Sequence, residues 1–331
     1  MQKRTHSSSI TGYLCIAAAA LFWGISANLG RAVFTGRLRL LGGVVPLVPP
    51  LMLAQSRTTI AALVLFPALW TVRGRGALRM ERGSIRDCIV LGVLGVAAAN
   101  YFYYLSIQRT SVATAIILQY LAPVFVLLWM LGRGLQRPTL QRISAVIVAV
   151  AGSVLAIGVV GRSPRFPWLA MLPGQVRFDA IGVAAALIAA VSFAFYNVFG
   201  RHLIVQHDRW KVMAWAFAGA AACWMVINPP WKVVAAHYSG AQWLFMAIFS
   251  MTSILIPFSF YFAGLHRLDA TRAIVTSCLE PVFCIIIAAM ALAEPVGRIQ
   301  SVGILLVLGS TVLVQLETEA KSPAPLLEPM E

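Results

Sequence analysis

The sequence predicts an all-α polytopic membrane protein, in which ten transmembrane helices form two inverted five-helix repeats. Composition, the recurrence of long apolar segments and an internal repeat lead to this prediction. Of the 331 residues, 60% are hydrophobic and only 11% are charged, whereas a typical soluble protein is about half apolar and about a quarter charged. We therefore expect the lipid bilayer to be the solvent for most of the chain.

Apolar segments long enough to cross a membrane recur along the whole chain, since a bilayer core about 30 Å thick requires about 20 apolar residues per helix. The predicted spans of the first half are residues 11–34, 47–70, 88–108, 110–132 and 141–160. Those of the second half are residues 179–200, 210–229, 241–264, 270–292 and 298–316. These segments are apolar on every face, unlike the alternating strands of a membrane barrel, so helices are expected.

The predicted domain organisation follows from these spans. Residues 1–160 form the first repeat and residues 179–316 the second, and the connector at residues 161–178 combines proline, glycine and arginine, which are typical of loops. Residues 317–331 are acidic and contain proline. Because such a segment has little apolar surface to bury, a disordered cytoplasmic tail is expected.

Lysine and arginine are concentrated in the connectors on one side of the predicted membrane. The loop at residues 71–87 dominates this bias, with Arg73, Arg75, Arg79, Arg82 and Arg86. Cytoplasmic loops carry such an excess, so both termini are predicted to be cytoplasmic. The short loops and many arginines favour a bacterial inner membrane as the location.

The remaining composition excludes several classes of protein. The net charge of +15 does not indicate nucleic-acid binding, because the basic residues lie in short connectors and form no soluble basic module. The five cysteines show no CxxC or Cys/His spacing, so neither a metal nor another cofactor is expected. No nucleophile elbow, zinc-binding histidine pair or nucleotide-binding loop is present, which argues against an enzyme and against ATP-driven transport.

An internal repeat is the most informative feature of the sequence. A shift of 158 residues aligns YFYYLSIQRTSVATAIILQYLAPVFV, which starts at Tyr101, with SFYFAGLHRLDATRAIVTSCLEPVFC, which starts at Ser259. Each half has an odd number of predicted spans, so the second copy enters the membrane from the opposite side. Inverted repeats of this kind recur in secondary transporters, where two related halves expose a central site alternately to each side.

The segments TSVATAIILQYLAPVFVLLWMLG and ATRAIVTSCLEPVFCIIIAAMALAEPVGRIQSVGILLVLGS resemble the repeats of EamA-type members of the drug/metabolite transporter superfamily. The most specific part is LEPVF, followed by AEP and by Gln-x-x-Gly in the last helix. The resemblance covers nearly the whole chain except its tails. It implies ten helices, cytoplasmic termini, a central cavity and, in most members, export of amino acids or other metabolites.

The chain departs from a symmetrical repeat in two places. Glu294 of the second half has no acidic counterpart in the LGRGLQRP segment of the first half, which places a symmetrical role for this glutamate in doubt. The connector near residues 35–46 is also unusually long.

Two ionisable residues within predicted spans are the first candidates for function, because charge inside a membrane is costly and usually faces a cavity or a partner. Glu280 is the acidic residue near the middle of a span, and its repeat equivalent is Ala122. It either exchanges protons or pairs with Arg57 or a substrate amine; the structural alternative is a hydrogen bond beside Pro281. Arg57 either lines the cavity or extends its side chain to the membrane surface.

Further candidates offer rings or hydrogen-bonding groups for a small amphipathic ligand, although each could equally pack against lipid or another helix. They are Trp23, Asn100, Tyr101, Tyr104, Gln119, Tyr196 and Asn197. Pro123 and Pro281 each remove a backbone donor and are expected to kink their helices, as a structural feature or as part of a gate. Arg201 ends the sixth span, where we expect its side chain to reach the membrane surface.

The leading functional hypothesis is a secondary transporter that exports a small metabolite, such as an amino acid, by alternating access. Its partners would be a small-molecule substrate and the bilayer, and proton coupling and facilitated diffusion both remain open. A receptor or scaffold without transport, and an importer or exchanger of the same fold, are the alternatives. The sequence does not identify the substrate, the direction of transport or the oligomeric state.

Overall fold

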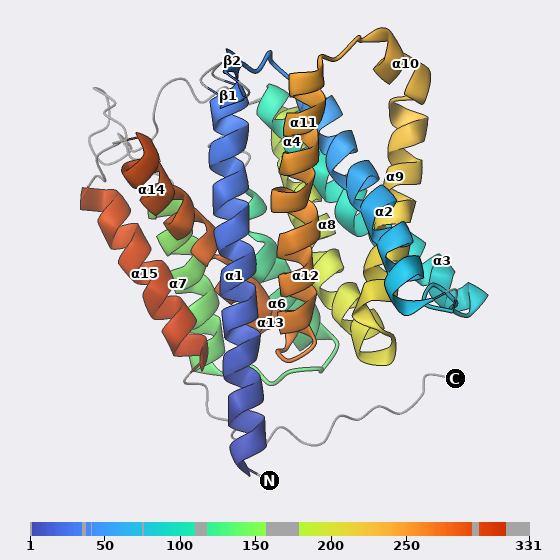
Figure 1. The fold of residues 1–331 in the computed structure, drawn as a ribbon. Helices are drawn as coiled ribbons and strands as arrows, with labels where there is room; N and C mark the ends of the chain where they lie inside the picture. Colours follow the sequence, from blue (N-terminus) through green and yellow to red (C-terminus); the bar gives the residue numbers. More distant parts are fainter. Residues whose placement is uncertain are drawn as a thin grey trace.

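The computed structural model describes residues 2–34, 38–40, 42–74, 76–109, 118–156, 179–292 and 298–315. Within these residues the chain is a bundle of helices with one short β-hairpin (Figure 1). The predicted all-helical membrane fold is therefore confirmed. Helices occupy every predicted span, although the span at residues 110–132 is described only from residue 118 onward.

The elements of the first half follow the predicted spans closely. They are α1 (Gln2–Phe34), β1 (Arg39–Leu40), β2 (Gly43–Val44), α2 (Pro50–Arg73), α3 (Arg82–Val90), the π-helical segment η1 (Leu91–Ala97), α4 (Ala98–Arg109), α6 (Ala122–Gly132) and α7 (Leu140–Ala156). Here α3, η1 and α4 together form the third span.

The second half repeats this order and adds a short helix between its second and third spans. Its elements are α8 (Ala180–Gln206), α9 (Arg209–Ile227), α10 (Pro230–Ala235), α11 (Gly240–Ser250), the π-helical segment η2 (Met251–Leu255), α12 (Ile256–Leu265), α13 (Ala270–Ser277), α14 (Leu279–Leu292) and α15 (Arg298–Gln315). The connector at residues 161–178 and the tail at residues 317–331 lie outside the described residues.

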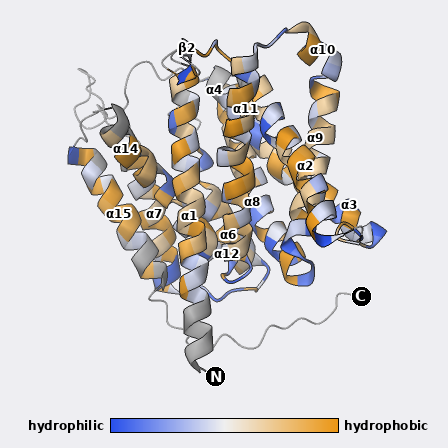
Figure 2. Ribbon diagram, in the orientation of Figure 1, coloured by the Kyte–Doolittle hydropathy of each residue, from blue (hydrophilic) through white to orange (hydrophobic). Residues whose placement is uncertain are grey.

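Six helical segments of the described chain are long and apolar enough to cross a membrane: Ser9–Gly30, Leu51–Arg73, Arg82–Ser106, Ala180–Gln206, Arg209–Ile227 and Gly240–Leu265. Shorter apolar helices accompany them at Ala122–Gly132, Leu140–Leu155 and Ser301–Ser310. Hydrophobic residues lie along the lengths of the helices, whereas hydrophilic residues mark ends such as the start of α3 (Figure 2). This distribution is the one that a bilayer requires.

The packing between helices obeys the internal repeat. Helix α1 packs on α12 and α14, and its repeat equivalent α8 packs on α4 and α6. Likewise α2 contacts α11 and η2, as α9 contacts α3 and η1, and α7 pairs with α15. The hairpin after α1 and helix α10 after α9 lie at the same end of the molecule (Figure 1). Helices α1 and α9 therefore end at the same side of the molecule. Since α8 leads directly into α9, α8 ends at the other side, so α1 and α8 run in opposite directions, as expected for an inverted repeat.

The unusually long first connector carries the β-hairpin, which the sequence analysis did not anticipate. Val45 and Val48 after the hairpin are buried in a cluster with Phe245 and Met246 of α11. The amide of Gln242 donates to the carbonyl of Leu47 at 3.1 Å. The connector is thus anchored on the start of α11.

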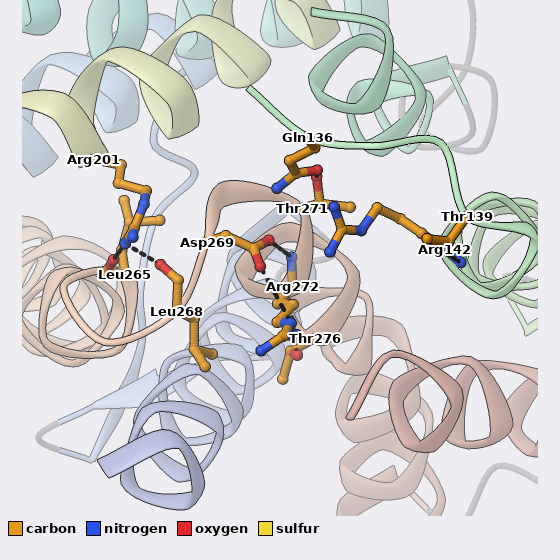
Figure 3. A network of polar contacts seen from close by, with 10 residues as sticks. All are labelled: Gln136, Thr139, Arg142, Arg201, Leu265, Leu268, Asp269, Thr271, Arg272 and Thr276. Atoms are coloured by element: carbon orange, nitrogen blue, oxygen red, sulfur yellow. Dashed lines mark hydrogen bonds and ion pairs between the residues drawn. The ribbon is translucent and has the colours of Figure 1, made fainter. Parts of the chain in front are cut away.

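At the opposite end of the molecule, the prediction that the Arg201 side chain reaches the membrane surface is wrong. Its guanidinium donates to the carbonyls of Leu265, at 2.6 Å, and Leu268, which the end of α12 leaves without helical partners. Beside it, the hydroxyl of Thr271 on α13 donates to the side-chain oxygen of Gln136 after α6, at 3.0 Å (Figure 3). This last hydrogen bond joins the two halves.

The third span and α9 approach each other closely because both carry glycine at the contact. A β-carbon added to Gly219 in α9 would lie 2.9 Å from the carbonyl oxygen of Ile89 in α3. A β-carbon added to Gly92 in η1 would lie 1.9 Å from the carbonyl oxygen of Ala216 in α9. No rearrangement of a flexible side chain can relieve this clash, because the obstacle is backbone. Gly92 and Gly219 therefore allow the close approach of the two halves at this interface.

We predict that Gly92→Ala lowers the melting temperature of the detergent-solubilised protein, because overpacking a tight contact costs about 1–3 kcal/mol. Gly309→Ala is the matched control, since a β-carbon there meets nothing within 4 Å. The measurement is a thermal unfolding curve, in which size-exclusion chromatography monitors the protein that remains folded after heating. Equal melting temperatures for the two variants would contradict the assignment of Gly92 as a close contact.

Candidate functional site

Arg57 lies within α2 and is held by groups from both halves of the molecule. Its Nη1 donates to Asn100 Oδ1 at 3.3 Å and to the Tyr104 hydroxyl oxygen at 3.1 Å, both on α4. Its Nη2 donates to the backbone carbonyl of Ser253 at 3.1 Å, in η2. The guanidinium is thus bound inside the bundle, and the alternative in which it extends to the membrane surface does not apply.

The local sequence explains why these partners are available. In a regular helix the carbonyl of Ser253 would accept from the N–H of residue 257, but Pro257 has none. The guanidinium of Arg57 supplies a donor in its place. On the other side, Asn100 Nδ2 donates to the carbonyl of Val96 in η1 at 2.7 Å, which leaves Oδ1 of the same amide facing Arg57. The π-helical segments of both halves therefore border the arginine.

Additional contacts fix the position of α2 at this depth. The Ser250 hydroxyl donates to the backbone carbonyl of Arg57 at 2.7 Å, and the guanidinium lies over the ring of Phe249 at 5.5 Å from its centroid. Two residues earlier, Gln55 exchanges hydrogen bonds with Asn228 at the end of α9, at 2.6 and 2.9 Å. The arginine is therefore rigidly placed.

Glu280 lies in the first turn of α14, where the helix dipole favours negative charge. The Tyr120 side chain hydrogen-bonds to its carboxyl group, and the charge of Arg57 acts on it. Tyr103 of α4 lies within electrostatic reach of both Glu280 and Arg57. Yet among the ion pairs of the described residues, none joins Arg57 to Glu280. The two charges face one region without direct contact.

Helix α1 holds the start of α14 in place. A β-carbon on Gly24 would lie 3.0 Å from the backbone nitrogen of Cys284 and 3.3 Å from the carbonyl oxygen of Glu280. The amide of Asn28 donates to the Cys284 carbonyl at 3.1 Å. Because α1 belongs to the first half, Glu280 is positioned by the half that carries Arg57.

Arg57, Glu280 and the four polar side chains near them are called the polar cluster below. None of them is fully buried, although they lie within the bundle: Arg57, Asn100, Tyr103, Tyr104, Tyr120 and Glu280. Together they offer one positive charge, one negative charge, three hydroxyl groups and an amide. This set suits a small ligand that carries both charge signs.

Three members of the polar cluster have repeat equivalents that lie in an aromatic core instead. Asn100 and Tyr104 correspond to Phe258 and Phe262 at the 158-residue shift, and both phenylalanines are buried. The hydroxyl of Tyr261, the equivalent of Tyr103, donates to the buried side-chain oxygen of Asn197. One half of the scaffold has therefore kept a polar face, whereas the other half has an apolar one.

The predicted site residues separate into groups. Four of them, Arg57, Asn100, Tyr104 and Glu280, come together in the polar cluster. Trp23 and Tyr196 lie in the aromatic core, where Trp23 meets Phe258 at 5.6 Å and Tyr261 at 5.2 Å between ring centroids.

The other predicted residues take different positions. Tyr101 faces Trp224, with 6.1 Å between ring centroids, and Asn197 bonds within the core. Gln119 is half-buried next to Tyr120. Pro123 and Pro281 lie near the starts of α6 and α14, just after the helix ends around Tyr120 and Cys278. A role in gating stays a prediction for both prolines.

Sequence reasoning missed Tyr103, Tyr120 and Ser253. The repeat alignment pairs Tyr103 with Tyr261, but this pairing looks like a scaffold feature. Tyr120 lies three residues before Pro123, and Ser253 four residues before Pro257. The interval of four residues before a proline marks a carbonyl without its helical donor, and this signal could have identified Ser253.

The described residues contain no group of three or more His, Cys, Asp or Glu side chains that could hold a metal ion. The polar cluster has no serine or cysteine nucleophile beside a base.

Comparison with known proteins identifies the family. Residues 10–158 and 180–316 each match the EamA-like transporter family. The chain is 22% identical to an uncharacterized inner membrane transporter, YicL, of Salmonella typhimurium, over 96% of this chain and 99% of that protein. It is 25% identical to an uncharacterized transporter, YcbK, of Bacillus subtilis, over 67% of this chain and 70% of that protein.

A solved crystal structure has the same fold, with a TM-score of 0.71 and 21% identity, covering 94% of this chain and 96% of the other. Two family repeats thus account for nearly all of the described helices, and they agree with the paired helices and the inverted packing. The chain belongs to the EamA-like transporter family and is a multi-pass membrane transporter.

Proposed function

We propose that this protein is a secondary transporter that exports a small metabolite, such as an amino acid, across a bacterial inner membrane by alternating access. The observation that carries the proposal is the placement of Arg57 and Glu280. They bring opposite charges from the two halves to one region inside the bundle without forming an ion pair. The anionic group of a suitable ligand would pair with Arg57, and its cationic group would pair with Glu280.

The cost of the two charges supports this proposal. An arginine cannot realistically lose its proton in a protein, and charged groups at membrane depth are rare outside functional sites. The repeat equivalent of Glu280 is Ala122, which is fully buried, so the scaffold alone does not require an acid. A carboxylate that the fold does not need is best explained by a ligand or a coupling ion.

Alternating access requires two similar halves that can exchange conformations. The reciprocal packing of α1 with α12 and α14, and of α8 with α4 and α6, supports this proposal because the two halves are alike. The helix ends at Tyr120 and Cys278 divide the fourth and ninth spans at equivalent positions, where hinge motion is possible. The hydrogen bond of Thr271 with Gln136 is one contact that must break if the halves separate at that end.

The orientation that we propose places both termini in the cytoplasm. The N-terminus, the start of α3 and the loop between α12 and α13 lie at one end of the molecule, whereas the hairpin and α10 lie at the other (Figure 1). The arginine-rich loop at residues 71–87 precedes and enters α3, so the excess of positive charge marks that end as cytoplasmic.

We expect the purified protein in liposomes to take up labelled amino acids in a saturable manner when a panel is screened with and without an imposed pH gradient. If Glu280 carries the coupling proton, uptake depends on the gradient and Glu280→Gln loses this dependence while it still folds. Glu81→Gln is the matched control, because Glu81 is exposed at the start of α3.

Gradient-dependent uptake that survives in Glu280→Gln would contradict a coupling role for Glu280. Gradient-independent uptake by the wild type would indicate a facilitator. Absence of uptake of every amino acid by well-folded protein would contradict the proposal that amino acids are the transported molecules.

We also predict that Thr271→Val shifts the balance between conformations, because it removes a hydrogen bond between the halves worth about 1 kcal/mol, or about a fivefold change in ratio. The readout is the labelling rate of Ser277→Cys by a membrane-impermeant maleimide. Thr252→Val is the control, since that hydroxyl bonds only to carbonyls of its own helix, at 3.0 and 3.3 Å. Equal labelling rates in both variants would argue against a separation of the halves at this contact.

A further inference from the structure

We propose that Arg57 and Ser253 form an anion subsite that binds the carboxylate of the transported molecule, while Glu280 and Tyr120 receive its amine. This inference rests on the proposed transport function and adds the chemistry and the orientation of the substrate. It makes a carboxylate the required feature of the cargo.

Two unsatisfied donors carry the inference. The Nε atom of Arg57 is buried and has no hydrogen-bond partner among the described residues, although both Nη atoms are engaged. The hydroxyl of Ser253 is likewise without a partner in the described part of the chain, and this residue is fully buried. Most buried serines of a helix bond to a carbonyl of the preceding turn, as Ser310 does with Val307 at 2.7 Å.

The two donors belong to residues that contact each other in space. Arg57 Nη2 donates to the backbone carbonyl of Ser253 itself, at 3.1 Å, so the guanidinium lies against the turn of η2 that carries the Ser253 hydroxyl. A buried donor without a hydrogen bond lowers the stability of the protein. A ligand with two acceptor atoms would supply a hydrogen bond to each of the two donors.

The charge of the site selects the acceptor. Within the described part of the chain, Arg57 has hydrogen bonds only to neutral groups, namely an amide, a hydroxyl and a backbone carbonyl. The ring of Phe249 covers its guanidinium and adds no negative charge. A carboxylate offers two acceptor oxygens and one negative charge, which match Nε and the hydroxyl of Ser253 together. A neutral carboxamide offers one oxygen acceptor and no charge.

The opposite end of the site has the complementary chemistry. The carboxyl of Glu280 accepts from Tyr120 and has no cation in direct contact among the described ion pairs. An ammonium group would satisfy it. A molecule with both groups is therefore oriented with its carboxylate toward η2 and its amine toward the start of α14.

The test uses wild-type protein, Ser253→Ala and Ser310→Ala in liposomes. Uptake of a labelled amino acid that the wild type transports is measured against three competitors: the same unlabelled amino acid, its carboxamide and the corresponding 2-hydroxy acid. The carboxamide keeps the amine and loses the negative charge, whereas the hydroxy acid does the reverse. Ser310 is the matched control, because it is equally buried and bonds within its own helix.

We expect the carboxamide to compete at least about tenfold more weakly than the amino acid in the wild type, because it leaves buried donors unpaired. In Ser253→Ala the amino acid weakens severalfold while the carboxamide does not, so their ratio falls; Ser310→Ala keeps the wild-type ratio. Equal competition by amino acid and carboxamide in the wild type, or an equal loss for both in Ser253→Ala, would overturn the anion subsite.

A second measurement separates this inference from the proposed transport. Thermal stabilisation of the purified protein by the same amino acids and carboxamides reports binding without flux. Stabilisation by the amino acids but not by their carboxamides, reduced in Ser253→Ala, would support the subsite even if no uptake occurred. Equal stabilisation by both, or by neither, would overturn it whether or not the protein transports.

Discussion

The guanidinium of Arg57 is the constraint on which the site depends, because a permanent positive charge within a membrane bundle must be compensated by its surroundings. The chain compensates it with neutral dipoles: the amide of Asn100, the hydroxyl of Tyr104 and the carbonyl of Ser253. The last of these lies in η2, four residues before Pro257, which has no backbone N–H to donate. The carboxyl group of Glu280 lies within electrostatic range of the arginine, but no ion pair of the described residues joins the two.

The symmetry of the scaffold and the asymmetry of the site serve different purposes. Packing between the halves is reciprocal, and both third spans contain a π-helical segment at equivalent positions, η1 and η2. The side chains that these segments present are unlike. The first half contributes Asn100, Tyr103 and Tyr104, whereas Phe258, Tyr261 and Phe262 of the second half pack with Trp23 and Tyr196. The aromatic side chains pack in one half, and most of the polar cluster comes from the other, so the site that we propose is asymmetric although the fold is duplicated.

Much of the fold could be predicted from the sequence, because the length and polarity of a membrane helix leave few alternatives. The spans and the inverted repeat were of this kind, and Glu280 and Arg57 stood out because charge is rare in such segments. The β-hairpin was missed because its strands are only two residues each. The π-helical segments could not be predicted, since their composition resembles that of the flanking α-helices. Trp23 and Tyr196 could not be distinguished from ligand-binding aromatics, because packing and binding favour the same rings. The partners of Arg57 depend on the register of α2 against η2, and the register between two packed helices cannot be predicted from a single sequence.

The central claim is that one small molecule occupies the space between Arg57 and Glu280. Cryo-electron microscopy of the purified protein with a saturating concentration of an amino acid that stabilises it would test this claim most directly. The account predicts ligand density that contacts Arg57 and Ser253 at one end and Glu280 and Tyr120 at the other. Density in the aromatic core beside Trp23 and Tyr196, with the polar cluster unchanged from the ligand-free protein, would contradict it.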